Sequence, residues 1–415
     1  MGKLIALKDI ETASKNLEGV AKHTLLEKNL ALSEKYDCEV YLKREDLQQV
    51  RSYKIRGAYN KMVSLSQQER DRGVICASAG NHSQGFAFSC FKLGISGTVY
   101  MPSTTPKQKI EKVKMFGKDK VTVVLTGDTF DDANEEAKKH GEREGLAFVH
   151  PFDDELVMAG QATVGKEIHE ALPEVDMLFL PVGGGGLFGG VSSYYKQKSP
   201  STKLIGVEPE GAPALKEALA AGKVVELDSI DQFVDGAAVK KVGLKTFDII
   251  KDTLDDLIMV PEGKTCSTIL ELYNQEAIVV EPAGSLTIAC LDFYKDKIKG
   301  KTIVCVVSGS NNDIDRMGEI KERSLVYEGL KHFFIVRFPQ RPGALKEFVS
   351  KVLGPDDDIT RFEFVKKNFR ESGPAFIGVE LKRKEDYQGL VDRMKEFGIN
   401  YTVINDDPSL FEYFV

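Results

Sequence analysis

The sequence predicts an α/β protein with parallel sheets, followed by a small α+β domain at the C-terminus. Short apolar runs bounded by glycine or proline alternate with longer amphipathic stretches as far as about residue 320. Continuous β-branched strands that alternate with helices are typical of parallel sheets covered on both faces. Beyond a charged segment, the order of the elements changes to βαββαβ, which is the ferredoxin-like arrangement.

Each element follows from its own pattern. The apolar runs expected to form strands lie at 38–43, 73–78, 97–102, 120–125, 177–182, 203–208 and 302–309. Amphipathic stretches predict helices at 81–94, 107–117, 129–145, 159–172 and 265–277. In the last part of the chain, strands are expected at 332–339, 359–368, 374–382 and 400–405, with helices at 343–354 and 384–398. We therefore expect one domain at 1–325 and a separate one at 328–415.

Composition narrows the class of protein. Apolar residues make up 42% of the 415 and charged residues 29%, as in ordinary globular proteins. The net charge of −7 argues against nucleic acid or an anionic membrane as the main partner. No apolar run reaches about 18 residues, so no membrane span is expected. The N-terminus lacks the apolar core of a signal peptide, which predicts a cytoplasmic protein.

The cysteines predict neither disulfides nor a metal site. All six are scattered, and Cys76 and Cys305 lie inside apolar runs. This spacing does not match a zinc site, and it is typical of buried thiols in a reducing compartment. We expect no bound metal.

Lys54 lies in "RSYKIRGAYN" and begins a helix predicted at 52–65. A helix N-terminus disfavours a cation, so it lowers the pKa of a lysine there. A neutral amine is able to form a Schiff base. Taken by itself, the same pattern also fits a solvated lysine in a first helical turn.

Three further segments follow predicted strands, at the edge of the sheet where ligands bind in open α/β folds. In "CASAGNHSQGFAF", small residues are followed by Asn81 and His82, which open a helix and leave backbone N–H groups for an anion. Taken by itself, this segment favours Asn81 as a cap of that helix, and His82 also fits a packed histidine. In "CVVSGSNND", Ser308 follows a buried strand, where it either aims a hydroxyl at the same crevice or caps a turn.

The remaining segment, "FLPVGGGGLFGG", places four consecutive glycines between a strand and a helix. Such a run is entropically costly unless the backbone closely approaches a ligand, so it predicts a phosphate cradle. It also contains G-x-G-x-x-G at Gly184, Gly186 and Gly189, and Glu208 ends the next strand. That combination imitates a dinucleotide fingerprint, so an oxidoreductase is an alternative hypothesis.

Together, the four segments resemble the fold-type II enzymes that use pyridoxal 5′-phosphate, and in particular the threonine dehydratase family. "SYKIRGA", "SAGNHSQG", "PVGGGGL" and "SGSN" occur in the family's order, and "GVEPEG" and "VVEPAGS" are also similar to family segments. The resemblance covers about residues 10–320. It implies two open parallel-sheet subdomains, with the smaller one at about 50–160 inserted in the larger.

The resemblance implies the site residues. Lys54 would hold the cofactor as a Schiff base and then remove the substrate Cα proton, with the Tyr53 ring beside the cofactor. Asn81 would bind its 3′-oxygen, and Ser308 would face its ring nitrogen. The backbone amides of the phosphate cradle are those of Gly183, Gly184, Gly185, Gly186 and Leu187. The substrate carboxylate would bind at the turn from Ser78 to His82.

The implied reaction is β-elimination from threonine, giving 2-oxobutanoate and ammonia, and a serine dehydratase or serine racemase of the same family is the alternative. The enzyme would be an ammonia-lyase in the first step of isoleucine biosynthesis. Ala79 stands where related serine racemases commonly have a serine that reprotonates Cα, so elimination is favoured over racemisation. Ala214 stands six residues after Glu208, where metal-dependent relatives have a carboxylate, which again predicts no metal.

The last domain resembles the ACT-like regulatory domain of biosynthetic threonine dehydratases, in a single copy. It implies feedback control by isoleucine first and valine second, and the family resemblance implies a homotetramer. "QRPGALKEF", from Arg341 to Phe348, is the loop where we expect the effector. The pattern of this loop by itself favours a helix that begins with proline in its first turn, and the ligand-facing loop follows from the resemblance.

Overall fold

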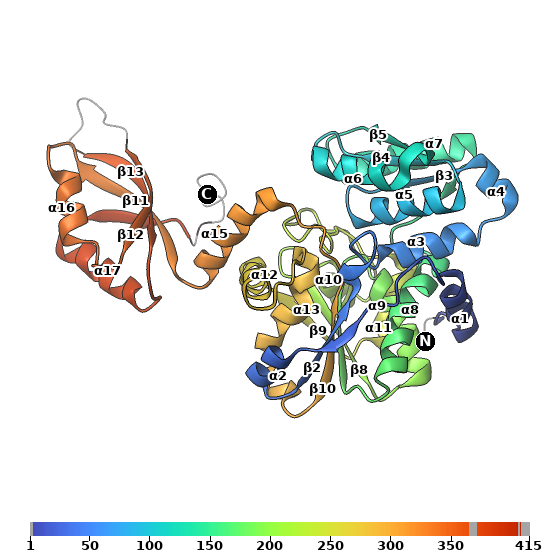
Figure 1. Ribbon diagram of the computed structural model, residues 1–415. Coiled ribbons are helices and arrows are strands. Elements are labelled where there is room, and N and C mark those ends of the chain that lie inside the picture. The colour runs from blue at the N-terminus through green and yellow to red at the C-terminus, as the bar shows by residue number, and fades with distance from the viewer. Residues whose placement is uncertain (1–2, 365–371, 406, 408–415) are drawn as a thin grey trace. The chain divides into compact units, whose positions relative to one another are not determined.

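A computed structural model describes residues 3–364, 372–405 and 407. The chain forms two compact units, residues 1–313 and 314–415 (Figure 1). The boundary expected near residue 325 falls at the end of helix α15, Met317–Tyr327, which belongs to the second unit. Within the described residues, no helix is long and apolar enough to cross a bilayer.

The larger sheet of the first unit is parallel except at one edge. Its strands are ordered β1-β2-β10-β7-β8-β9. The bounds are β1 Leu26–Lys28, β2 Glu39–Arg44, β7 Met177–Pro181, β8 Lys203–Pro209, β9 Asp256–Val260 and β10 Thr302–Val307. Only β1 pairs antiparallel, with β2. We did not predict this short edge strand because it has no apolar run of its own.

Helices lie on both sides of this sheet (Figure 1). Their bounds are α1 Leu7–Asn16, α2 Leu30–Tyr36, α8 Glu155–Ala171, α9 Gly186–Lys198, α10 Ala214–Ala221, α11 Leu244–Thr253, α12 Glu262–Glu276, α13 Pro282–Ala289 and α14 Lys295–Ile298, with 3-10 turns η1 Glu45–Leu47 and η3 Cys290–Phe293. One core cluster joins α1, α8 and α9 to the sheet, through fully buried side chains such as Ile10, Phe188 and Val304. Because helices cover both faces of the sheet, its strands are buried on both sides. This explains why the strand segments predicted from the sequence are continuously apolar.

The smaller sheet has four parallel strands in the order β5-β4-β3-β6. These are β3 Val74–Ala77, β4 Gly97–Met101, β5 Val121–Leu125 and β6 Ala147–Phe148. The helices of this part are α3 Lys54–Val63, α4 Gln67–Arg72, α5 Asn81–Leu93, α6 Lys107–Gly117 and α7 Phe130–Glu144, with the 3-10 turn η2 Lys118–Lys120. The strands and helices predicted between residues 73 and 145 are confirmed. Its core is separate, around Phe86, Cys90 and Val99.

The second unit has the predicted βαββαβ order. After the turn η4 Ile314–Arg316 and α15 come β11 Lys331–Pro339, α16 Ala344–Lys351, β12 Asp358–Phe364, β13 Ser372–Glu380, α17 Asp386–Glu396 and β14 Asn400–Val403. The sheet order is β12-β13-β11-β14, with every pairing antiparallel. The end of the strand expected at 359–368, namely 365–368, lies outside the described residues.

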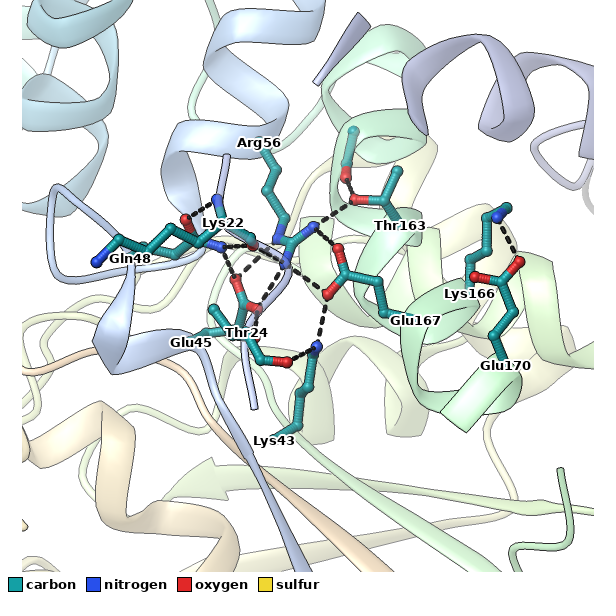
Figure 2. A network of polar contacts seen from close by, with 11 residues as sticks. Lys22, Thr24, Lys43, Glu45, Gln48, Arg56, Thr163, Lys166, Glu167 and Glu170 are labelled. Carbon is teal, nitrogen blue, oxygen red and sulfur yellow. Dashed lines mark hydrogen bonds and ion pairs between the residues drawn. The ribbon is translucent and has the colours of Figure 1, made fainter. Parts of the chain in front are cut away.

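A buried group of charges holds helix α3 in place. We call it the Arg56 cluster: Lys43, Glu45, Arg56 and Glu167 (Figure 2). The Arg56 guanidinium makes bidentate contacts with Glu45, at 2.8 Å to both oxygens, and with Glu167, at 2.6 and 2.9 Å. Lys43 donates to Glu167 at 2.5 Å. Two cations and two carboxylates therefore tie α3 to β2, η1 and α8.

Candidate active site

Lys54 is the first residue of α3, and its amine is turned inward. Its Nζ donates to the carbonyl of Pro151 at 2.8 Å and lies 5.3 Å from the centre of the Tyr53 ring. Burial lowers the pKa of Lys54 to about 8, with the negative charge of Glu281 partly opposing that shift. This lysine is therefore not a solvated surface charge, and its amine deprotonates nearer neutral pH than a free lysine.

Backbone pairing places Ser308 beside the start of α3. Ser52 bridges Gly309 in antiparallel fashion, and the Tyr53 amide donates to the Ser308 carbonyl at 3.2 Å. Ser308 is only 2% exposed and directly follows β10. The predicted neighbours Lys54 and Ser308 therefore belong to segments that lie side by side, although they are far apart in sequence.

The turn after β3 leads directly into the first turn of α5. Ser78 donates its backbone N–H to the Tyr100 carbonyl at 3.0 Å, and its Oγ accepts from the Gly80 amide at 3.2 Å. The amides of Asn81 and His82 begin α5, so intrahelical acceptors for them are lacking. The turn is thus suited to an anionic group, as its sequence predicted.

His82 itself is buried and neutral. Its Nε2 lies 2.8 Å from the carbonyl of Val149, and burial, followed by the charge of Lys54, lowers its pKa to about 3. Its Nδ1 has no partner within the part of the chain that the structure describes. The imidazole is therefore packed in the interior, which is one of the two roles that its sequence allowed.

Asn81 belongs to a closed polar group that the sequence did not reveal. We call Asn81, Glu281 and Asn311 the Asn81 triad. The Asn81 Nδ2 donates to Glu281 Oε1 at 2.6 Å, and the Asn311 Nδ2 donates to Asn81 Oδ1 at 2.6 Å. The Asn311 backbone amide completes the group by donating to Glu281 Oε2 at 3.1 Å.

The four glycines pass closely against neighbouring residues. A Cβ on Gly184 would lie 2.4 Å from the Phe152 ring, and one on Gly183 would lie 2.7 Å from the Ala237 carbonyl. Gly185 has φ +88°, a left-handed conformation that favours glycine, and α9 begins at Gly186. In the described chain, the amides of Gly183 to Leu187 donate no hydrogen bond to another residue. They are the unpartnered donors that a phosphate cradle requires.

One loop, Val149 to Asp153, contacts three parts of this arrangement: the start of α5, Lys54 and the glycine run. The Val149 carbonyl contacts His82, the Pro151 carbonyl contacts Lys54, and the Phe152 ring packs on Gly184. Asp153 caps α11 by accepting from the backbone amides of residues 244–246. The loop was not predicted from the sequence because it carries no motif, and its contacts with Lys54 and His82 are made by backbone carbonyls.

Glu281 and Asn311 were also missed as site residues, although both lie in segments that the sequence singled out. Glu281 is the acid of "VVEPAGS", and Asn311 follows Ser308 in "SGSNND". An acid inside an otherwise apolar run was the signal that could have identified Glu281, since buried carboxylates need a specific reason.

Glu208 is occupied as a helix cap. Its carboxylate accepts from the backbone amides of Leu215 at 2.7 Å and Lys216 at 3.1 Å, in the first turn of α10. Burial raises the pKa of Glu208 to about 7. The dinucleotide hypothesis needed this carboxylate free for a ribose, so that hypothesis loses its acid. No three His, Cys, Asp or Glu side chains gather as a metal site among the described residues.

Comparison with known proteins agrees with this geometry. Residues 18–309 match the family of pyridoxal-phosphate dependent enzymes, and residues 322–414 match the C-terminal regulatory domain of threonine dehydratase. Because the first match covers more than half of the chain, this is a pyridoxal-phosphate dependent enzyme.

The relatives define the family more narrowly. The chain is 58% identical over 416 residues to the biosynthetic L-threonine dehydratase IlvA of Halalkalibacterium halodurans, with 100% of both chains covered. It is 38% identical to the structure of processed threonine deaminase isoform 2 from Solanum lycopersicum, with TM-score 0.72, covering 78% of this chain and 96% of that one. Serine racemase from Dictyostelium discoideum follows at 31% identity and TM-score 0.69, covering 75% and 99%. The chain belongs to the biosynthetic threonine dehydratases.

Proposed function

We propose that the chain converts L-threonine to 2-oxobutanoate and ammonia by β-elimination, with Lys54 as the reacting lysine. The inward-turned amine of Lys54 is the observation that carries this proposal, since it donates to the Pro151 carbonyl and its pKa is lowered to about 8. The full-length similarity to biosynthetic threonine dehydratases supports the substrate and the place of the reaction in isoleucine biosynthesis.

The residues present fit pyridoxal phosphate. The phosphate would be held by the amides of Gly183, Gly184, Gly185, Gly186 and Leu187, which lack other acceptors, at the positive end of α9. Lys54 would attach the carbonyl carbon, with Tyr53 alongside. Asn81 would donate to the ring oxygen, and Ser308 would face the ring nitrogen.

When bound, the cofactor supplies an electron sink that makes the substrate Cα proton acidic. Lys54 takes that proton once its amine is neutral, which a lowered pKa favours near physiological pH. The threonine hydroxyl leaves as water as the Cα–Cβ double bond forms. The imine form of the released product then consumes one water as it hydrolyses. The water released by elimination and the water consumed by hydrolysis cancel, so threonine yields 2-oxobutanoate and ammonia.

The turn from Ser78 to His82 would orient the substrate by its carboxylate. Backbone amides at the N-terminus of α5 favour an anion there, and the neutral His82 adds no charge of its own. Ala79 has no proton to give to the opposite face of Cα. We therefore expect elimination from threonine, then serine, and no racemisation.

The test is to measure 2-oxo acid release from threonine and from serine by the wild type and by Lys54→Ala. We expect threonine to be the better substrate, and the variant to lose both activity and the yellow colour of lysine-bound cofactor. Unchanged 2-oxo acid release by Lys54→Ala would overturn the assignment of Lys54. Conversion of L-serine mainly to D-serine would overturn the reaction.

The regulatory unit completes the proposal. We expect isoleucine, and more weakly valine, to bind at the loop from Arg341 to Phe348. Gly343 in this loop has φ +84°, and Arg341 pairs with Glu347 at 2.7 Å. We further propose a cytoplasmic homotetramer, supported for the compartment by six buried cysteines that form no disulfide with one another. Sedimentation velocity checks the assembly, and a dimer or monomer contradicts it.

A further inference from the structure

Glu281 lies in a tightly enclosed position next to the proposed cofactor site. It precedes α13, is only 4% exposed, and donates its backbone amide to the Gly309 carbonyl at 3.2 Å. A Cβ on Gly309 would lie 2.5 Å from Glu281 Oε1, and one on Gly236 would lie 3.2 Å away. The carboxylate therefore has little room to turn, and its two oxygens have fixed directions.

A carboxylate accepts hydrogen bonds and donates none when ionised. Glu281 Oε1 accepts from Asn81 Nδ2, and Asn311 Nδ2 donates to Asn81 Oδ1 while also donating to the Val50 carbonyl at 2.9 Å. If the Asn81 amide were turned over, its oxygen would face the carboxylate and its nitrogen would face a donor. Both contacts would be repulsive, so the Asn81 triad permits one orientation only.

This orientation leaves one N–H of Asn81 unused. Nδ2 carries two hydrogens, one of which goes to Glu281. The second has no acceptor within the described residues, which suits it to a ligand oxygen. A reversed amide would present a carbonyl to that oxygen and would repel it.

We propose that Glu281 is a positioning residue that fixes the direction of the Asn81 amide, so that Asn81 always presents an N–H to the ring oxygen of the cofactor. This inference rests on the proposed function of Asn81 and adds the group that acts through it. Elsewhere in the site, Lys54 and Ser308 are placed by backbone pairing, whereas an asparagine amide needs such a partner to choose between its two orientations.

The raised pKa of Glu281 also supports a functional role for this carboxylate. Burial raises the pKa of Glu281 to about 7, repulsion by Asp235 adds to the shift, and the hydrogen bond from Asn81 and the charge of Lys109 oppose it. Holding a carboxylate under these conditions is costly, and such groups concentrate at functional sites.

The test is a double-mutant cycle on the affinity of the apoenzyme for pyridoxal phosphate, followed by the visible absorbance of the bound form. Glu281→Gln keeps the size of the side chain but can present an amide nitrogen, so Asn81 loses its fixed direction. We expect the variant to bind the cofactor about tenfold more weakly, within the coupling typical of one hydrogen-bond network. In the Asn81→Ala background, Glu281→Gln should have no further effect.

Glu208→Gln is the matched control. Glu208 is also a buried carboxylate, with its pKa raised to about 7, but it contacts only the backbone of α10. We expect it to change cofactor affinity and absorbance little. If Glu281→Gln does not fold, Asn311→Ala removes the other group that orients Asn81 and is taken through the same cycle.

Equal weakening by Glu281→Gln in the wild-type and Asn81→Ala backgrounds would overturn the inference, as would an unchanged affinity and spectrum. Either result leaves the proposed reaction intact, provided that the wild type binds cofactor and loses its colour in Lys54→Ala. Failure of the wild type to bind pyridoxal phosphate at all would instead overturn the proposed function.

Discussion

At the scale of single residues, the buried amine of Lys54 gives the enzyme a pH dependence that a surface lysine would not have. The neutral amine is the reactive form, and its pKa is lowered to about 8. The rate at which apoenzyme attaches pyridoxal phosphate should therefore rise with pH and level off above about 8. Stopped-flow absorbance across the pH range checks this.

A free lysine side chain provides the comparison for that measurement. Its pKa is about 10.4. The rate at which pyridoxal phosphate attaches to Nα-acetyllysine should therefore keep rising through the pH range where the enzyme's rate has levelled off. An enzyme curve that follows the free lysine would show that burial does not tune this amine.

Gly184 is a second residue at which a single contact restricts the side chain. A Cβ there would lie 2.4 Å from the Phe152 ring, so Gly184→Ala must displace the ring or the glycine loop. Overpacking of this kind costs about 1–3 kcal/mol, and here we expect it to appear as weaker cofactor binding. Equilibrium titration of the apoenzyme with pyridoxal phosphate measures it.

Two variants make the Gly184 result specific. Phe152→Ala combined with Gly184→Ala removes the clash and should recover part of the lost affinity. Gly318→Ala adds a Cβ in open space within α15 and should leave cofactor binding unchanged. Wild-type affinity in Gly184→Ala itself would refute the close-packing argument.

At the scale of elements, the Arg56 cluster decides where α3 lies and hence where Lys54 points. Glu167 is 12% exposed in its side chain and shares Arg56 with the fully buried Glu45. Glu167→Gln leaves Lys43 and Arg56 with one carboxylate between them. Breaking a buried ion pair in this way costs about 3–5 kcal/mol, which should lower the apparent unfolding midpoint in urea.

The neighbouring ion pair on α8 is the control for the Arg56 cluster (Figure 2). Glu170 pairs with Lys166, but its side chain is 53% exposed. Exposed pairs contribute little, so Glu170→Gln should change stability by at most about 0.5 kcal/mol. Equal shifts of the unfolding midpoint in Glu167→Gln and Glu170→Gln would mean that the buried cluster stabilises the protein no more than an exposed ion pair does.

At the scale of the whole molecule, regulation should be separable from catalysis because the two units have their own cores. Arg341→Gln removes the ion pair with Glu347 in the proposed effector loop. We expect it to raise the isoleucine concentration for half-inhibition by about fivefold or more, with uninhibited activity unchanged. Titration of isoleucine against 2-oxo acid release checks this.

Arg383 serves as the comparison within the same unit. It forms a similar exposed ion pair with Asp386, at the start of α17. Arg383→Gln should leave isoleucine inhibition as in the wild type. Should both variants respond alike, the effector does not bind at the loop from Arg341 to Phe348.

Elements with local causes could be predicted from the sequence. Apolar runs placed most strands of the three sheets within a few residues, and helix signals placed α5, α6, α7, α16 and α17, whereas α1, α2, α10, α11 and α13 were not predicted. Gly185 needs a left-handed backbone and Lys54 begins a helix, and both features are visible in short stretches of sequence. Four motifs in order were enough to indicate the family.

Only the tertiary structure decided which groups meet. Lys54 contacts the carbonyl of Pro151, 97 residues away, and Asn81 contacts Glu281, 200 residues away. Neither contact leaves a periodic or compositional signal, because a carbonyl is present at every residue and a buried acid is identified only once its neighbours are known. The same reason explains Glu208, whose position after a strand suggested a ligand but whose carboxylate caps α10. The chain encodes its elements locally, and folding brings their ends together into one site.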